Sequence, residues 1–224
     1  MTDKKILIFM GPPGVGKGTL ASKFEDRMAL TTVSTGQLFR ENIEKKTELG
    51  LRVQNVINSG ALVSDEIVNA VFETWFDENW GGCTSGILLD GYPRSLNQAV
   101  FLTNFLALKK VLKNTVVCLV EAQDQAILDR IMGRMVCSNS ECGSIYSMAD
   151  KLPEDLTCLK CGSHLSKRKD DDLSCAQVRL KGYRSYKNEL ISHFLKQNIR
   201  ILTVDTDGKN PESVFEEFKV LLSN

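Results

Sequence analysis

Four cysteines in the second half of the chain are spaced like the ligands of a structural metal ion. Cys137 and Cys142 are separated by four residues, Cys158 and Cys161 by two, and 15 residues lie between the pairs. Four thiolates at such spacings form a closed tetrahedral zinc site. The seven cysteines are an odd number, and in a reducing compartment a cluster of four indicates metal before disulfides. The sequence leaves open four free or oxidised thiols, and His164 is a lesser candidate ligand.

A second group of residues has the pattern of a phosphate-binding loop. Residues 11–19 read Gly-Pro-Pro-Gly-Val-Gly-Lys-Gly-Thr and fit G-x-x-x-x-G-K between an apolar run and a helical segment. Glycines allow backbone N–H groups to point at phosphate oxygens, the helix start adds partial positive charge, and Lys17 adds a full one. The residues expected to contact phosphate are Gly14, Val15, Gly16, Lys17, Gly18 and Thr19. The alternative is a glycine-rich turn that binds nothing.

Asp90 is the candidate magnesium residue. It ends the apolar run 87–89, which places a carboxylate at the carboxyl edge of a buried strand. Magnesium that bridges phosphates keeps several waters, so we expect Asp90 to bind it through water. Gly18 stands where the general loop motif has Ser or Thr, which argues against direct ligation by a hydroxyl there. The alternative for Asp90 is a turn residue before Gly91.

Composition excludes several classes of protein. The chain has 224 residues, and its 28 Lys and Arg balance its 28 Asp and Glu, so bulk charge does not hold it to nucleic acid. No apolar stretch reaches the roughly 20 residues that a membrane span needs. The apolar run after Lys5 is too short for a secretory signal. We therefore expect a cytoplasmic protein, and nothing in the sequence demands a partner chain, so we expect a monomer.

The elements that must position these groups alternate along the chain. Apolar runs that read as buried strands are 6–10, 32–33, 86–90, 115–120 and 199–204, and helical patterns separate them. This alternation predicts an α/β fold, a three-layer sandwich around a parallel five-stranded sheet. Segments 34–63 and 134–171 read as excursions over the ligand-binding edge. The core is expected to comprise 1–33, 64–133 and 172–224.

Three motifs together resemble one known family. Gly-Lys-Gly-Thr at 16–19, Ser-Thr-Gly at 34–36 and Asp-Gly-Tyr-Pro-Arg at 90–94 are similar to the long, lid-bearing bacterial adenylate kinases, which are nucleoside monophosphate kinases. The resemblance runs from residue 5 to about residue 220. It implies a magnesium-dependent enzyme that converts ATP and AMP to two ADP, with 34–63 a monophosphate-binding flap and 134–171 a zinc-binding lid. The family's lids usually have C-x2-C in the first pair, whereas this chain has C-x4-C. A kinase for another base, or with GTP as donor, is the alternative within the class.

The resemblance also implies roles for individual residues. ATP would contact the six loop residues named above together with Arg130, Arg134, Ile145 and Tyr146. AMP would contact Thr35, Arg40, Ala61, Leu62, Val63, Gly91, Tyr92, Pro93, Arg94, Gln98, Arg168 and Arg179. The residues implied for the transfer itself are Lys17, Arg94, Arg134, Arg168 and Arg179. Tyr92 stands where the family usually has Phe.

The charged residues support two further predictions and one alternative. Arg130 and Arg134 are four residues apart in an expected helix over 123–135, so both should project from one helix face. Arg168 and Arg179 flank the aspartates 170–172, which are expected to hold the guanidiniums when phosphate is absent. The basic run 167–169 also permits a protein of a different class, a zinc-ribbon nucleic-acid binder with the loop as a switch. The zero net charge and the adjacent aspartates oppose it.

Overall fold

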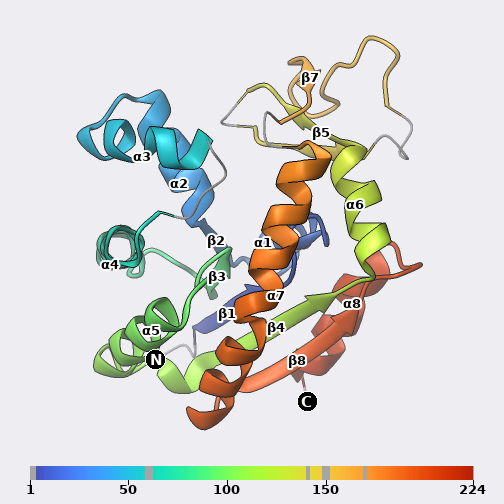
Figure 1. Cartoon of the computed structure of the whole chain (residues 1–224). Coiled ribbons are helices and arrows are strands. Elements are labelled where there is room, and N and C mark those ends of the chain that lie inside the picture. Colours follow the sequence, from blue (N-terminus) through green and yellow to red (C-terminus); the bar gives the residue numbers. More distant parts are fainter. Residues whose placement is uncertain (1–3, 59–62, 140–141, 148–151, 169–170, 224) are drawn as a thin grey trace.

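The core of the molecule is a parallel sheet of five strands, as the sequence predicts. The computed structural model describes residues 4–58, 63–139, 142–147, 152–168 and 171–223 (Figure 1). The strands follow the order β2-β3-β1-β4-β8 and all neighbours are parallel. Their bounds are β1 Lys5–Met10, β2 Thr31–Ser34, β3 Gly86–Asp90, β4 Thr115–Glu121 and β8 Arg200–Asp205.

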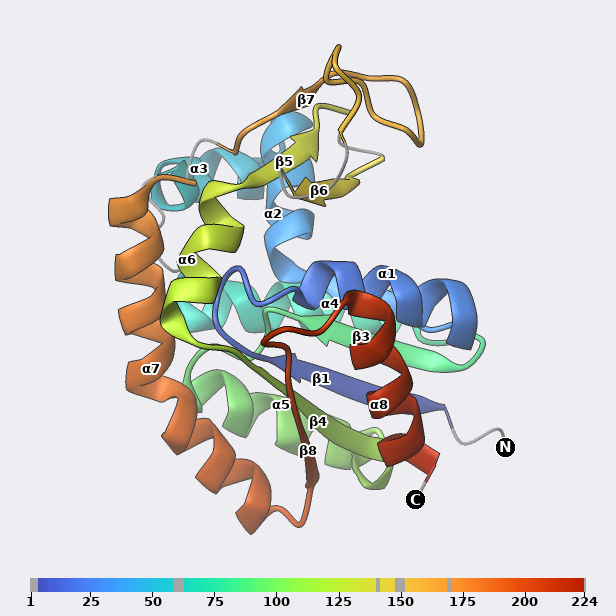
Figure 2. The same cartoon turned by 90° about the vertical axis from the view of Figure 1, so that its right-hand side faces the viewer.

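Helices bury both faces of this sheet, which explains why its strands read as continuous apolar runs. Successive residues of β1 alternate between two buried clusters, with Ile6 and Ile8 in one and Leu7 and Phe9 in the other. Helices α1 and α8 cover the second face, and α4, α5 and the end of α7 cover the first (Figure 1, Figure 2). Their bounds are α1 Lys17–Met28, α4 Asp65–Asn79, α5 Leu96–Leu108, α7 Leu173–Lys196 and α8 Pro211–Ser223. The predicted three-layer α/β fold is therefore confirmed.

Two groups of elements stand above the carboxyl ends of the strands. Helices α2 and α3 pack on each other on one side, and a separate antiparallel sheet in the order β6-β5-β7 lies on the other (Figure 1). These elements are α2 Thr35–Glu44, α3 Glu48–Asn58, β5 Arg134–Cys137, β6 Ile145–Ser147 and β7 Leu165–Ser166. They fall within the two predicted excursions. A short 3-10 helix over Leu112–Asn114 precedes β4.

One predicted helix is shorter than expected, which changes the position of an arginine. Helix α6 spans Asp124–Met132, Gly133 caps it, and Arg134 opens strand β5. The prediction that Arg130 and Arg134 project from one helix face is therefore wrong. Glycine has among the lowest helix propensities, so the chain leaves the helix there and turns into the small sheet. Among the described residues, no helix combines the length and hydropathy that crossing a membrane would require.

Candidate functional site

A cavity of about 830 Å³ lies at the carboxyl ends of the sheet strands, where parallel α/β folds bind ligands. The phosphate loop, α2, the segment after β3, the small sheet, α7 and the segment after β8 all contribute to its wall. The cavity brings together most of the site residues expected from the sequence. Those that line it are Gly14, Val15, Gly16, Lys17, Gly18, Thr19, Arg40, Asp90, Gly91, Pro93, Arg94, Arg130, Arg134, Ile145, Tyr146, Arg168 and Arg179.

The other expected site residues lie elsewhere. Thr35, Val63, Tyr92 and Gln98 are buried and do not line this cavity, while Ala61 and Leu62 fall outside the described residues. Tyr92 is a core residue whose ring stacks on Phe72 with centroids 5.1 Å apart. Its hydroxyl donates to Asn69 Oδ1 at 2.7 Å, and burial raises the pKa of the phenol. The hydroxyl at a position where the family usually has Phe therefore has a hydrogen-bond partner.

Lys17 is the centre of positive charge in the cavity. Its Nζ donates to the carbonyl oxygens of Gly11 and Pro12, each at 2.8 Å. Burial lowers the pKa of Lys17 from 10.5 to about 8. The carboxylate of Asp90 raises this pKa, whereas three guanidiniums lower it further: those of Arg94, Arg179 and Arg134. Three guanidiniums therefore repel the Lys17 ammonium, and a polyanion bound among them would relieve that repulsion.

Arg94 is held beside the sheet by the glycine at the end of β3. Arg94 Nε donates to the Gly91 carbonyl oxygen at 2.7 Å. Gly91 has φ +78°, and a Cβ there would lie 2.6 Å from Arg94 Nη2. A side chain at this position would therefore be strained and would displace the guanidinium. Glycine is therefore required at position 91 by the position of the Arg94 guanidinium as well as by the turn.

Arg130 and Arg134 are held by different partners on different elements. Arg130 donates to the hydroxyl of Thr206 at 2.7 Å and to its carbonyl oxygen at 2.9 Å. Arg134 Nε donates to Asp171 Oδ2 at 2.7 Å, and Arg134 Nη2 bonds to Oδ1 of the same carboxylate. Asp171 therefore holds Arg134, a pair that the sequence did not predict. Asp172 caps α7 by accepting the Cys175 N–H at 2.9 Å, and Asp170 lies outside the described residues.

Gly18 lies where the small sheet meets the phosphate loop. A Cβ at Gly18 would lie 3.2 Å from Cδ1 of Ile145 in β6, which is tighter than nearly all such contacts in proteins. The general motif's Ser or Thr would therefore press on Ile145. This contact gives a structural reason for glycine at the one position where the loop departs from the general pattern. Thr19, one residue later, lines the cavity.

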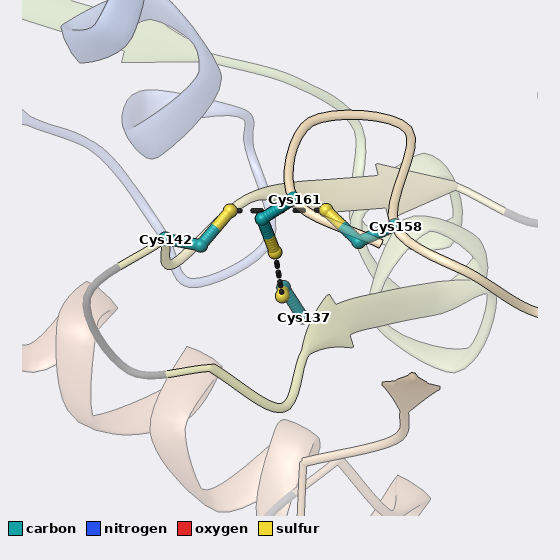
Figure 3. Close-up of side chains that lie close together, drawn as sticks. All are labelled: Cys137, Cys142, Cys158 and Cys161. Atoms are coloured by element: carbon teal, nitrogen blue, oxygen red, sulfur yellow. Dashed lines mark hydrogen bonds between the residues drawn. The ribbon is translucent and has the colours of Figure 1, made fainter. Parts of the chain in front are cut away.

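The four cysteines converge as a metal site requires. Their sulfur atoms all lie within 4.8 Å of one another and point toward a common centre (Figure 3). The Cys137–Cys161 and Cys142–Cys158 sulfurs are 3.4 and 3.7 Å apart. In a tetrahedral site with Zn–S bonds of about 2.3 Å, sulfurs are about 3.8 Å apart, so this donor set fits zinc. His164 is not part of the cluster among the residues described.

Hydrogen bonds to the sulfur atoms support the cysteine cluster. The backbone N–H groups of Lys160 and Cys161 donate to Cys158, and that of Ser163 donates to Cys161. The Tyr146 hydroxyl lies 3.3 Å from the Cys158 sulfur, and this bond is the largest cause that lowers the pKa of Cys158 to about 6. These bonds favour the thiolate, the form that binds metal. The remaining cysteines do not join the cluster: Cys83 and Cys118 are buried in the core, and Cys175 is on α7.

Two further sets of residues were not predicted from the sequence. Thr206, Lys209 and Asn210, which follow β8, also line the cavity. The rule that ligands lie beyond the carboxyl ends of parallel strands could have found them. Asp65, at the start of α4, accepts hydrogen bonds from Ser95 and Gln98. No spacing in the sequence indicates this second set, because the contacts join helices about 30 residues apart.

Comparison with known proteins agrees with this geometry. The family model described as adenylate kinase matches residues 9–199. The chain belongs to the adenylate kinase family. The adenylate kinase of Thermoanaerobacter sp. (strain X514) is 38% identical over 220 residues, which cover 97% of this chain and 98% of that protein. The adenylate kinase of Fervidobacterium nodosum is 39% identical over 97% of this chain and 95% of that protein, and that of Methanosarcina barkeri is 36% identical over 96% and 97%.

Membership of the adenylate kinase family makes the chain a phosphotransferase of the nucleoside monophosphate kinase class. It binds nucleotides, and its four-cysteine cluster is compatible with zinc. The alternative of a zinc-ribbon nucleic-acid binder is not favoured by these comparisons.

Proposed function

We propose that this chain transfers the γ-phosphoryl group of ATP reversibly to AMP, giving two molecules of ADP. The observation that carries the proposal is the convergence of Lys17, Arg94, Arg134 and Arg179 on one cavity above the sheet. Phosphoryl transfer needs in-line positioning and neutralisation of charge on the equatorial oxygens, and clustered cations supply both. An AMP phosphate oxygen attacks the γ-phosphorus, and the bond to the β–γ bridging oxygen breaks as ADP leaves.

The chain's own residues divide this work. On the donor side, the loop 14–19, Arg130, Arg134, Ile145 and Tyr146 bind ATP, and Lys17 is placed against its phosphates. On the acceptor side, Thr35, Arg40, residues 61–63, Gly91–Arg94 and Gln98 bind AMP, while Arg168 and Arg179 bridge the reacting phosphates. Magnesium, when bound, neutralises the ATP phosphates, and Asp90 would hold it through water.

Two segments are proposed to move against the core of 1–33, 64–133 and 172–224. The flap over 34–63 and the lid over 134–171 close on the bound nucleotides and exclude water, because water at the γ-phosphorus would hydrolyse ATP. The four cysteines hold a structural zinc ion that replaces the hydrophobic core which so small a lid cannot build. We further propose that the protein acts as a monomer in the cytoplasm.

A coupled assay of ADP formation with AMP, CMP, UMP and GMP as acceptors, and ATP or GTP as donor, tests the function. AMP with ATP is expected to give the highest kcat/KM. Faster turnover with another base or with GTP would replace adenylate kinase by a related kinase. No acceleration with any monophosphate would overturn the phosphotransferase activity.

A further inference from the structure

A closed set of hydrogen bonds surrounds the side chain of Gln98. Its Nε2 donates to Asp65 Oδ1 at 2.7 Å, and its Oε1 accepts the backbone N–H of Arg94 at 2.7 Å. The other oxygen of Asp65 accepts the Ser95 hydroxyl at 2.8 Å, and Ser95 in turn accepts the Gln98 N–H at 3.1 Å. Gln98 is 3% exposed, so its amide is fixed in a buried setting.

These partners allow only one orientation of the amide. The Asp65 oxygen that faces Gln98 can only accept while the carboxyl group is ionised, and a backbone N–H is only ever a donor. If the amide were turned over, its oxygen would face Asp65 and its NH₂ group would face the Arg94 N–H. Both contacts would then be repulsive inside the protein, where unpaired polar groups are costly. Asp65 and the Arg94 N–H therefore fix the amide from its two ends, and of these two partners only Asp65 is a side chain that a substitution can change.

Within the described part of the chain, these partners use one N–H and one lone pair of the amide and leave one of each for a ligand. Adenine presents an amino donor beside a ring acceptor, and a glutamine amide can bind both at once. Hypoxanthine has nearly the same shape but carries a carbonyl at position 6 and an N–H at N1. Its Watson–Crick edge therefore demands the opposite orientation of the amide. This step rests on the proposed function, in which Gln98 faces the base of the monophosphate.

We propose that Asp65 is a specificity-determining positioning residue, which makes Gln98 select adenine over 6-oxopurines by holding its amide in one orientation. Asp65 begins α4 two residues after Val63, where the proposed flap ends. The same carboxylate therefore links the end of the flap to the segment that carries Arg94.

The test compares AMP with IMP as acceptor in wild-type protein and in Asp65→Asn. An asparagine amide can present either its oxygen or its NH₂ group, so Asp65→Asn removes one of the two constraints on Gln98 and leaves the Arg94 N–H as the other. The preference for AMP over IMP in kcat/KM is expected to fall by about tenfold or more, mainly through the KM of the monophosphate. The KM for ATP is expected to stay within about twofold, because the residues proposed to bind ATP do not include Gln98 or Asp65.

Two controls separate orientation from loss of structure. Glu66→Gln removes the same charge from the first turn of α4, at an exposed position, and should leave the AMP to IMP preference unchanged. Ser95→Ala weakens the same network and uncaps α5, but it leaves the acceptor for Gln98 in place. It should lower the melting temperature with little change in preference.

Three results would overturn the proposal: an unchanged preference in Asp65→Asn, an equal loss in Ser95→Ala, or a loss that tracks melting temperature across the variants. Should Asp65→Asn fail to fold, Asp65→Ser takes its place, since a hydroxyl also donates or accepts. Failure of both to fold would assign Asp65 to the fold and reject the selectivity role. Wild-type protein inactive with AMP would instead reject the proposed function, so the two failures are distinguishable.

Discussion

The cavity and the small sheet each gather groups of one chemical kind. Around the cavity, Lys17 and three guanidiniums lie close enough to repel one another, which favours the binding of a polyanion. In the small sheet, four cysteine sulfurs lie within 4.8 Å of one another, an arrangement that suits a metal cation. The cavity stands on strands buried on both faces by large apolar clusters. Among the residues that the structure describes, the small sheet has a buried cluster of four, two of which are themselves ligand candidates: Met135, Cys137, Cys158 and Leu165.

This difference predicts what each ligand does for the protein. The core under the cavity buries enough apolar surface to fold whether or not phosphate is bound, so anion-binding side chains there can be optimised for reaction. The small sheet buries little apolar surface apart from its cysteines, so a metal ion bound to them contributes to folding. Variants of the first region should lose rate and keep stability, and variants of the second should do the reverse.

Lys17→Met should produce the largest loss of activity. We expect kcat to fall by about a hundredfold to a thousandfold, as when one preorganised transition-state donor is removed. The free energy of unfolding at pH 7 should not fall, because burial already disfavours the charged lysine in the folded protein. Coupled assays and thermal melts measure both. Lys23→Met, on the same helix and paired with Glu212, is the control and should keep its rate. A destabilised Lys17→Met with near-normal kcat would reverse the comparison.

Removal of metal should act on the second region. Treatment with a chelator, or Cys142→Ser, should lower the melting temperature by about 10 °C, whereas the rate at low temperature should change much less. Bound zinc is measured by elemental analysis, and calorimetry follows unfolding. Cys175→Ser is the matched control: it lies outside the cluster on α7 and should retain full metal content. If chelation abolished activity without changing the melting temperature, the metal would have a catalytic role in place of a structural one.

The sequence predicted the parts of this comparison that depend on local pattern. The alternation of apolar runs with helical patterns predicted the parallel sheet. Each strand could be recognised because a strand buried on both faces is a continuous apolar run, such as 6–10. The phosphate loop and the cysteine pairs were also found by spacing. The error at Arg134 came from extending a helical period through Gly133, a residue that itself indicates a helix end.

Contacts between distant elements could not be predicted in the same way. The carboxylate of Asp171 binds Arg134, 37 residues away, a pair that no spacing in the sequence indicated. Gln98 was identified, but its partner Asp65 was not, since that contact depends on how α4 and α5 pack. Charge and composition do not encode such pairs, and only tertiary packing determines them.

The smallest effect expected is a dependence of ATP affinity on pH that belongs to the cavity alone. In the free protein the pKa of Lys17 is about 8, and bound polyphosphate raises it by favouring the charged form. Affinity is therefore constant below pH 8 and weakens as pH rises above it, by about tenfold between pH 7 and 9.

Calorimetric titration with a non-hydrolysable ATP analogue measures this dependence, and repetition in buffers of different ionisation enthalpy detects the proton taken up on binding. Lys17→Met should bind more weakly at every pH but with a flat profile between pH 7 and 9. An equally steep profile in that variant would assign the titration to another group. It would also show that the charge of Lys17 does not determine how phosphate affinity depends on pH.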